Sequence, residues 1–169
     1  KPKSVLDSSA GWGDRLITAI AYGCSYTGFD PSECLESKYK DIIKTLASDP
    51  SKYKVIKKPF EEVILKKKYD IAFTSPPFFD MEDYENSNDQ SIKKFPNINE
   101  WINKFLIKLV DKNIEALKIG GYFIIYVPYY PKLLKYLKKN KNIKFINDIT
   151  YSYDISKKIR RIAVYKKIQ

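Results

Sequence analysis

The sequence contains no histidine, and this absence excludes several kinds of catalytic site. A self-contained Ser-His-Asp triad, a histidine general base and most zinc sites all need that side chain. The two cysteines, Cys24 and Cys34, have no Cys-x-x-Cys spacing, so neither a metal site nor a disulfide framework is indicated. We therefore expect no bound metal and a reducing, intracellular compartment.

Long apolar runs are missing as well. No stretch of 18 or more apolar residues occurs, and the opening Lys-Pro-Lys-Ser lacks the basic and apolar regions of a signal peptide. The sequence thus predicts a soluble chain with no membrane partner. Because residue 1 is lysine and not methionine, the chain is also compatible with being part of a longer protein.

Positive charge is abundant. Lys and Arg number 31 against 20 Asp and Glu, which gives a formal net charge of +11 over 169 residues. The length, with 44% hydrophobic residues, predicts a single domain over 1–169 with its own core. The charge favours nucleic acid, DNA or RNA, as a partner. The alternative is a surface of solvated lysines, and the runs at 57–58, 66–68 and 138–139 fit either interpretation.

Short apolar strands alternate with amphipathic helices along the chain. Strands are expected at 4–7, 25–30, 53–57, 69–74, 122–127, 143–155 and 160–168. Helices are expected at 14–22, 31–47, 101–114 and 131–137, the third of them ended by the glycine pair at 120–121. The segment 79–99 is polar and is expected to be irregular.

This alternation predicts an α/β fold in which helices cover both faces of a mostly parallel, seven-stranded sheet. The last two strands leave no room for a helix between them. They are therefore expected to form a C-terminal antiparallel hairpin at one edge of the sheet.

The unusual residues follow the predicted strands, where open α/β sheets bind ligands. The first strand leads into residues 7–13, Asp-Ser-Ser-Ala-Gly-Trp-Gly, whose glycines let the backbone approach a ligand. Asp30 ends the second strand, where a carboxylate can accept hydrogen bonds from ribose hydroxyls. Leu16 replaces the third glycine of GxGxxG, which disfavours a dinucleotide. A nucleoside site is indicated, although tight strand-to-helix turns would give the same pattern.

A sharper pattern follows the fourth strand as Thr74-Ser75-Pro76-Pro77-Phe78. Two consecutive prolines fix the backbone and leave carbonyl groups available as acceptors, and an aromatic ring comes next. The segment is typical of a set of hydrogen-bond acceptors beside a stacking surface.

These two motifs resemble those of class I S-adenosylmethionine-dependent methyltransferases, specifically the type that methylates exocyclic amines of nucleobases. The family's Asp-Pro-Phe-x-Gly-x-Gly corresponds to residues 7–13, and its (Asp/Asn/Ser)-Pro-Pro-(Tyr/Phe/Trp) to residues 75–78. The resemblance spans nearly the whole chain and implies a Rossmann-like fold with S-adenosyl-L-methionine as cofactor. Two departures stand out: Ser9 replaces the family's Phe, and the chain begins at the first strand, without the covering helix ahead of it or the separate target-recognition region that the family usually carries. A separate recognition domain or partner subunit would supply what is missing.

The resemblance also implies roles for individual residues. The cofactor-binding residues would be Asp7, Ser9, Ala10, Gly11, Gly13, Asp30, Pro31, Phe60 and Thr74. The catalytic residues would be Ser75, Pro76, Pro77 and Phe78. Ser75 and the Pro76 carbonyl would accept the two amino hydrogens of the target base, and Phe78 would stack on its ring. Such acceptors make the amine a better nucleophile without a strong general base, which suits a chain without histidine.

The expected reaction is methyl transfer to cytosine N4 or adenine N6 in DNA or RNA, with serine at the head of the motif favouring cytosine slightly. Two alternatives stay open. One is N-methylation of a protein glutamine, whose enzymes typically carry Asn in place of Ser75. The other is a non-catalytic methyltransferase-like module that binds nucleic acid or supports a partner.

Three further features have two interpretations each. The acidic segment 80–85 is either a flap over the base pocket or a solvated loop. Trp12 packs over the cofactor or target, or against the first helix. Arg160 and Arg161 either stabilise the terminal hairpin or contact phosphate.

Overall fold

The computed structural model describes residues 1–79, 91–128, 130–151 and 160–169. Strands in these ranges are β1 (Ser4–Asp7), β2 (Ser25–Phe29), β3 (Tyr53–Ile56), β4 (Tyr69–Thr74), β5 (Leu117–Ile125), β6 (Ile143–Tyr151) and β7 (Arg160–Lys167). Helices are α1 (Asp14–Tyr22), α2 (Glu33–Leu46), α3 (Ser91–Lys94), α4 (Ile98–Glu100), α5 (Ile107–Glu115) and α6 (Pro131–Lys139). Short turns of other helix types are η1 (Pro50–Lys52), η2 (Phe60–Glu62) and η3 (Trp101–Leu106).

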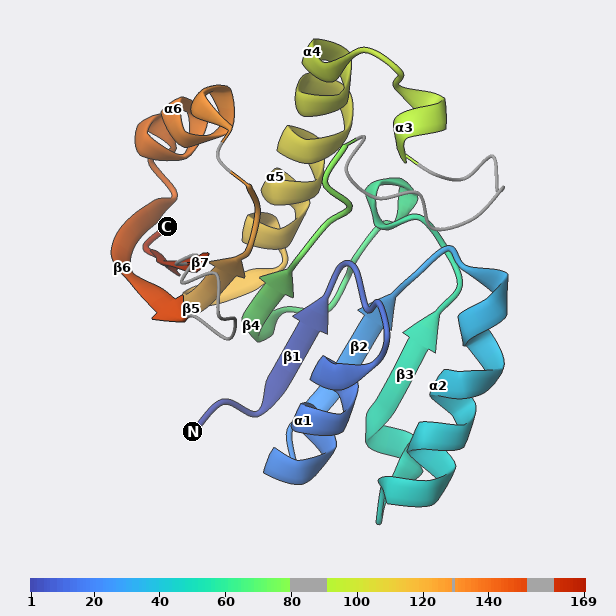
Figure 1. Ribbon diagram of the computed structural model, residues 1–169. Coiled ribbons are helices and arrows are strands. Elements are labelled where there is room, and N and C mark those ends of the chain that lie inside the picture. Colours follow the sequence, from blue (N-terminus) through green and yellow to red (C-terminus); the bar gives the residue numbers. More distant parts are fainter. Residues whose placement is uncertain (80–90, 129, 152–159) are drawn as a thin grey trace.

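The described strands form one seven-stranded sheet in the order β3-β2-β1-β4-β5-β7-β6. Strands β1 to β5 pair in parallel, whereas β7 is antiparallel to both β5 and β6. The predicted α/β fold is thereby confirmed, including the mostly parallel sheet and the C-terminal antiparallel hairpin. Figure 1 shows the arrowheads of β1, β3 and β4 pointing the same way, so their carboxyl ends share one edge.

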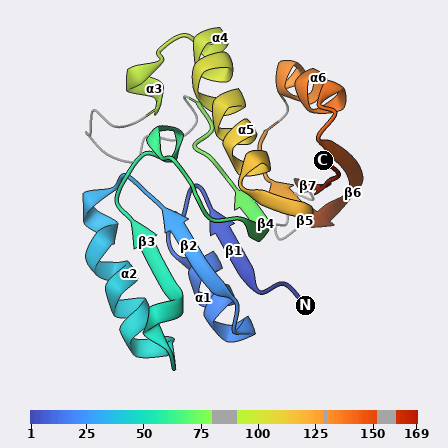
Figure 2. The same cartoon turned by 180° about the vertical axis from the view of Figure 1, so that it is seen from behind.

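The two faces of the sheet have separate cores, because side chains alternate along each strand. On one face Val5 and Tyr26 pack with Leu16 of α1 and Tyr39 of α2. On the other face the larger core holds residues of β1, β4 and β5 together with α5, η3 and α6, among them Leu6, Ala72, Phe123, Leu109 and Leu133. Figure 1 and the reverse view in Figure 2 show α1 and α2 beside β1 to β3, and α5 with α6 toward β5 and β6.

The glycine pair at 120–121 corrects one expected boundary. It was expected to end the helix, but α5 ends at Glu115, and β5 begins five residues earlier than expected, at Leu117. Gly120 has a φ of 82°, and pairing with β4 shifts register between Tyr69 and Ile71. A Cβ at Gly121 would come within 3.0 Å of the Asp70 carbonyl oxygen. The glycines therefore serve a close backbone approach at a β-irregularity.

Other expected boundaries differ slightly. The segment 79–99 is not wholly irregular, because α3 and the start of α4 lie within it, while 80–90 lies outside the described residues. Strand β6 is described to Tyr151, and the end of its expected range belongs to 152–159, which is also outside. Among the described residues, no helix has the length and apolarity to cross a membrane.

Candidate active site

The predicted site residues converge on the carboxyl edge of the sheet. Strand β1 lies between β2 and β4, so the segments that follow these three strands are neighbours. They are the glycine loop (residues 7–13), Asp30 and the Pro-Pro loop (residues 74–79). The Ser9 and Thr74 hydroxyl oxygens lie 3.3 Å apart, which joins the glycine loop directly to the Pro-Pro loop.

The glycine loop has the backbone that its sequence predicts. Gly11 and Gly13 have φ values of 57° and 93°, in the left-handed region that other residues rarely adopt. A Cβ at Gly13 would lie 2.9 Å from Cδ1 of Ile42, so packing against α2 also requires glycine there. Ala10 is buried in the core between β2 and the helices, and its backbone N–H donates to the Phe29 carbonyl oxygen at 2.9 Å.

Asp7 is fully buried beneath this loop and is surrounded by donors. Its carboxylate accepts hydrogen bonds from the Ser9 amide at 3.1 Å, the Tyr26 hydroxyl at 2.6 Å and Arg15 Nε at 2.7 Å. A buried carboxylate needs such partners, since desolvation without them is costly. The structure therefore gives Asp7 the position of an anchor for the loop.

Arg15 is a site residue that sequence reasoning did not single out. Besides Asp7, its guanidinium donates to the Ser9 carbonyl oxygen, and its Cζ lies 4.9 Å from the centre of the Phe73 ring. Burial alone would lower the pKa of Arg15, but the Asp7 carboxylate outweighs it and raises that pKa. Arg15 thus ties α1, the glycine loop and β4 together. Its signal in the sequence is a cation in the first helical turn, where cations are unfavourable without a specific partner.

Asp30 links the glycine loop to the start of α2. One carboxylate oxygen accepts the Gly11 amide and the other the Ser32 amide, each at 2.9 Å. Burial raises the pKa of Asp30, although these two donors oppose the rise. The side chain is half-buried, and each oxygen has a second acceptor position. The Tyr39 hydroxyl also interacts with this carboxylate, so Asp30 can receive a further hydroxyl donor without losing its bonds to the two amides.

The remaining two residues expected to hold the nucleoside differ in exposure. Pro31 is exposed directly after Asp30. Phe60, in η2, is only 2% exposed, and its ring centre lies 5.2 Å from that of Phe29 at the end of β2. Phe60 therefore lies under the site and supports it from the core. Trp12, at the tip of the glycine loop, is 76% exposed and packs in neither core.

The Pro-Pro loop leaves acceptors unused. Within the described ranges, neither the Ser75 hydroxyl nor the Pro76 carbonyl oxygen takes part in a hydrogen bond. Thr74 is fully buried and Ser75 half-buried, and burial alternates along the rest of the motif. Pro76 is buried and Pro77 half-buried. The loop thus presents two fixed acceptors beside the glycine loop.

The aromatic residue of the motif, Phe78, is 8% exposed and contacts Tyr126, which follows β5. The two ring centres are 5.4 Å apart and meet edge to face at 74°. The Tyr126 hydroxyl in turn accepts a hydrogen bond of 2.6 Å from Arg160, at the start of β7. Arg160 therefore does connect the terminal hairpin to the site.

Phe79, the last residue of the Pro-Pro loop, makes a second aromatic contact. Phe79 has a positive φ of 51° and packs 5.6 Å from Trp101 in η3. Trp101 is fully buried and also lies 5.7 Å from Tyr130, just before α6. A π-helical turn such as η3 is frequent at functional sites.

Among the described residues, one buried side-chain oxygen beneath the glycine loop, that of Asn113, forms no hydrogen bond. Asn113 of α5 is fully buried, and its amide nitrogen donates to Ser8 Oγ at 2.9 Å and to the Leu109 carbonyl oxygen. Its Oδ1 is buried and forms no hydrogen bond with the described part of the chain. Asn113 thus supports the glycine loop from the opposite face of the sheet, which no sequence pattern indicated.

Comparison with known proteins gives matches by structure. No protein-family model and no curated protein sequence matches the chain. An rRNA methylase from Streptococcus thermophilus matches with a TM-score of 0.67 at 13% identity, over 99% of this chain and 88% of that one. SMU.1697c of Streptococcus mutans, described as a methyltransferase and crystallised with SAH, gives 0.68 at 13% over 99% and 90%. TrmN from Thermus thermophilus gives 0.71 at 14%, over 98% of this chain and 44% of that one.

The chain has the Rossmann-like methyltransferase fold. The matched proteins place nearly all of this chain in that fold, and the strand order is the one described above. Identities of this size establish the fold and leave the reaction to be argued from the site.

Proposed function

We propose that the protein transfers a methyl group from S-adenosyl-L-methionine to an exocyclic amino nitrogen of a nucleobase in a nucleic acid. The observation that carries the proposal is the pair of unused acceptors on Ser75 and Pro76, fixed beside a glycine loop of the methyltransferase fold. Cytosine N4 and adenine N6 both present two amino hydrogens to such a pair. The rRNA methylase among the structural matches supports RNA over DNA.

The residues present fit the cofactor. The two positive-φ glycines leave positions 11 and 13 of the loop without side chains, and the half-buried Asp30 carboxylate can accept a hydrogen bond from a ribose hydroxyl. The backbone of residues 9–13 would hold the methionine portion, with Pro31 and Phe60 near the adenine. When bound, S-adenosyl-L-methionine supplies an electrophilic methyl group on a sulfonium.

The chain's own groups prepare the acceptor. The lone pair of an exocyclic amine is delocalised into the ring, which makes the amine a weak nucleophile. Acceptors on Ser75 and Pro76 hold its hydrogens out of the ring plane and so restore electron density on nitrogen. Phe78 and Tyr126 form the apolar side of the base site. The methylated nitrogen is acidic and releases its proton to solvent, so no histidine is needed.

The test separates cofactor binding from transfer. Titration calorimetry with S-adenosylhomocysteine is expected to show binding that Asp30→Asn weakens by about tenfold, the value of a lost charged hydrogen bond. Incubation with isotopically labelled methyl donor and mixed RNA and DNA, followed by nucleoside mass spectrometry, identifies the methylated base. Ser75→Ala is expected to lower kcat by roughly 10 to 100-fold with donor affinity unchanged.

Each alternative gives its own result in the same assays. Label recovered in protein, with none in nucleosides, would replace the nucleobase with a glutamine amide as acceptor. Oligonucleotide binding by a protein that binds no S-adenosylhomocysteine would mark a non-catalytic module.

A further inference from the structure

Helix α6 differs from the other long surface helices in its charge. It carries Lys132, Lys135, Lys138 and Lys139 and no acid, so its net charge is +4, and Lys141 lies two residues beyond its end. Helix α2, of similar exposure, has three acids and three lysines and a net charge of zero. The lysines of α6 are therefore not balanced by any acid on the same helix.

The lysines of α6 are also unpaired. In the described parts of the chain, none of the five lysines from 132 to 141 forms an ion pair. On α2, by contrast, Lys40 pairs with Glu36 at 2.7 Å. A nearby carboxylate, that of Asp111 on α5, accepts a hydrogen bond from the Tyr136 hydroxyl instead. Unpaired like charges repel one another, and binding of a polyanion would relieve that repulsion.

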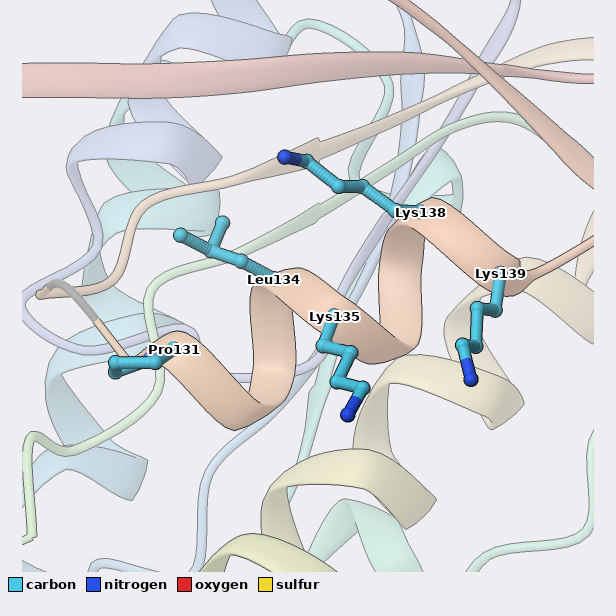
Figure 3. A pocket seen from close by; sticks show the side chains of 5 residues that line it. All are labelled: Pro131, Leu134, Lys135, Lys138 and Lys139. Atoms are coloured by element: carbon cyan, nitrogen blue, oxygen red, sulfur yellow. The ribbon is translucent and has the colours of Figure 1, made fainter.

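Three of the lysines share one side of the helix. Lys132, Lys135 and Lys139 have the i, i+3, i+7 spacing of a single helical face and line an open groove with Ile107 of α5 and Asn142. Figure 3 shows Lys135 and Lys139 extending to one side of α6, while Lys138 and Leu134 extend to the other. The three-lysine row covers about 10 Å along the helix, the length of roughly three nucleotides in a strand.

The row begins near the candidate active site. Two aromatic contacts connect the Pro-Pro loop to the start of α6: Phe79 meets Trp101 edge to face, and Trp101 contacts Tyr130, the residue before α6, with the rings tilted. A strand whose base lies beside Ser75 would therefore pass close to the first turn of α6. Leu133 and Leu137 of α6 are buried and Leu134 is half-buried, so the exposed surface of the helix is mainly lysine and lacks the broad apolar face that inserts into a lipid surface.

We propose that the groove side of α6, formed by Lys132, Lys135 and Lys139, binds the phosphate backbone of the nucleic acid whose base enters the site. This inference rests on the proposed function for the identity of the polymer. Lysines bind phosphates as point charges, so the surface contributes affinity and register without base specificity.

The test is oligonucleotide affinity measured as a function of salt. A triple variant, Lys132→Gln, Lys135→Gln and Lys139→Gln, is titrated into fluorescent single-stranded RNA and, separately, DNA. The slope of log K against log salt is expected to fall by about 2 to 3, and affinity near 0.1 M salt by on the order of 100-fold. Binding of S-adenosylhomocysteine and the thermal unfolding midpoint are expected to stay unchanged.

The chain offers a matched control on α2. The variant Lys38→Gln, Lys40→Gln and Lys44→Gln removes the same charge from a helix on the other face of the sheet. Equal losses of affinity in the two variants would overturn the proposal, since net charge alone would then govern binding. So would a wild-type protein that binds anionic vesicles but neither oligonucleotide. A protein that binds RNA through α6 but no methyl donor would uphold the surface and overturn the enzymatic proposal.

Discussion

The two edges of the sheet use carboxylates in opposite ways. At the amino edge, Asp70 accepts hydrogen bonds from the Ser4 amide at 2.9 Å and from Lys118 Nζ at 2.7 Å. Mainly because of the Lys118 bond, the pKa of Asp70 falls to about 2. At the carboxyl edge, burial raises the pKa of Asp30. At the amino edge, the hydrogen bonds of Asp70 stabilise the fold. At the carboxyl edge, the partly desolvated carboxylate of Asp30 is held in place at some cost to stability.

At the carboxyl edge, some polar groups have hydrogen-bond partners and others have none in the described chain. Asp7 and Arg15 satisfy each other beneath the glycine loop, while the acceptors of Ser75 and Pro76 stay without partners in the described chain. A rigid, bonded base thus positions groups that are left for a ligand, which is the usual requirement of a preorganised site. Four substitutions test the difference between the residues that stabilise the fold and those left for a ligand.

The largest effect is expected from Asp7→Ala. It leaves the Arg15 charge without its buried partner, so the free energy of unfolding should fall by about 3 to 5 kcal/mol. Urea denaturation measures the change. The double variant Asp7→Ala, Arg15→Met should recover part of the loss, because the uncompensated charge is gone. If the double variant is as unstable as the single one, the loss of stability comes from packing and not from the unpaired charge.

A smaller effect is expected from Gly13→Ala. The backbone there has φ of 93°, and the new Cβ would lie 2.9 Å from Ile42, so strain and overpacking together cost about 2 to 4 kcal/mol. Gly23→Ala is the control, since φ is 72° but nothing lies within 4 Å; it should cost about 1 kcal/mol. Equal losses of stability in the two variants would show that packing against Ile42 adds nothing to the effect of the backbone strain. Thermal unfolding distinguishes the outcomes.

Phe78→Leu is expected to act on target binding. Leucine keeps the apolar contact with Tyr126 but cannot stack on a base, which is worth about 1 to 3 kcal/mol. The apparent KM for an oligonucleotide should rise accordingly, while calorimetry should show unchanged S-adenosylhomocysteine affinity. Loss of both affinities would make Phe78 a structural residue of the loop.

The smallest effect belongs to the amino edge. The pKa of Asp70 is about 2 in the folded protein, below the unfolded value of 3.8, so ionised Asp70 stabilises the fold above pH 4. That contribution is lost as the pH falls through 2. Partial exposure limits it to about 1 kcal/mol. Asp70→Asn should lower stability by this amount at pH 7 and leave activity intact. A variant with the wild-type acid dependence would show that Asp70 contributes nothing.

The sequence predicted where the residues of the candidate site come together, because its signals are local. The glycines at 11 and 13, the acid at 30 and the two prolines at 76–77 each constrain their own backbone, and parallel strands bring such ends to one edge. It missed Arg15, Asn113 and Tyr126 because their roles depend on partners distant in sequence. Asn113, for instance, reaches Ser8 across 105 residues.

The sequence by itself determined the alternation of strands and helices, the seven-stranded sheet and the segments that follow its strands, since these depend on hydrophobic periodicity and on the fixed backbone preferences of glycine and proline. The tertiary structure decided which polar groups are satisfied and which are free. It buried Asp7 beside Arg15, placed Phe78 against Tyr126 and put the glycine pair within β5, where the sequence predicted a helix end. Among the described residues, it also left the lysines of α6 without ion pairs. Burial and pairing arise from contacts between distant segments, and no local pattern encodes them.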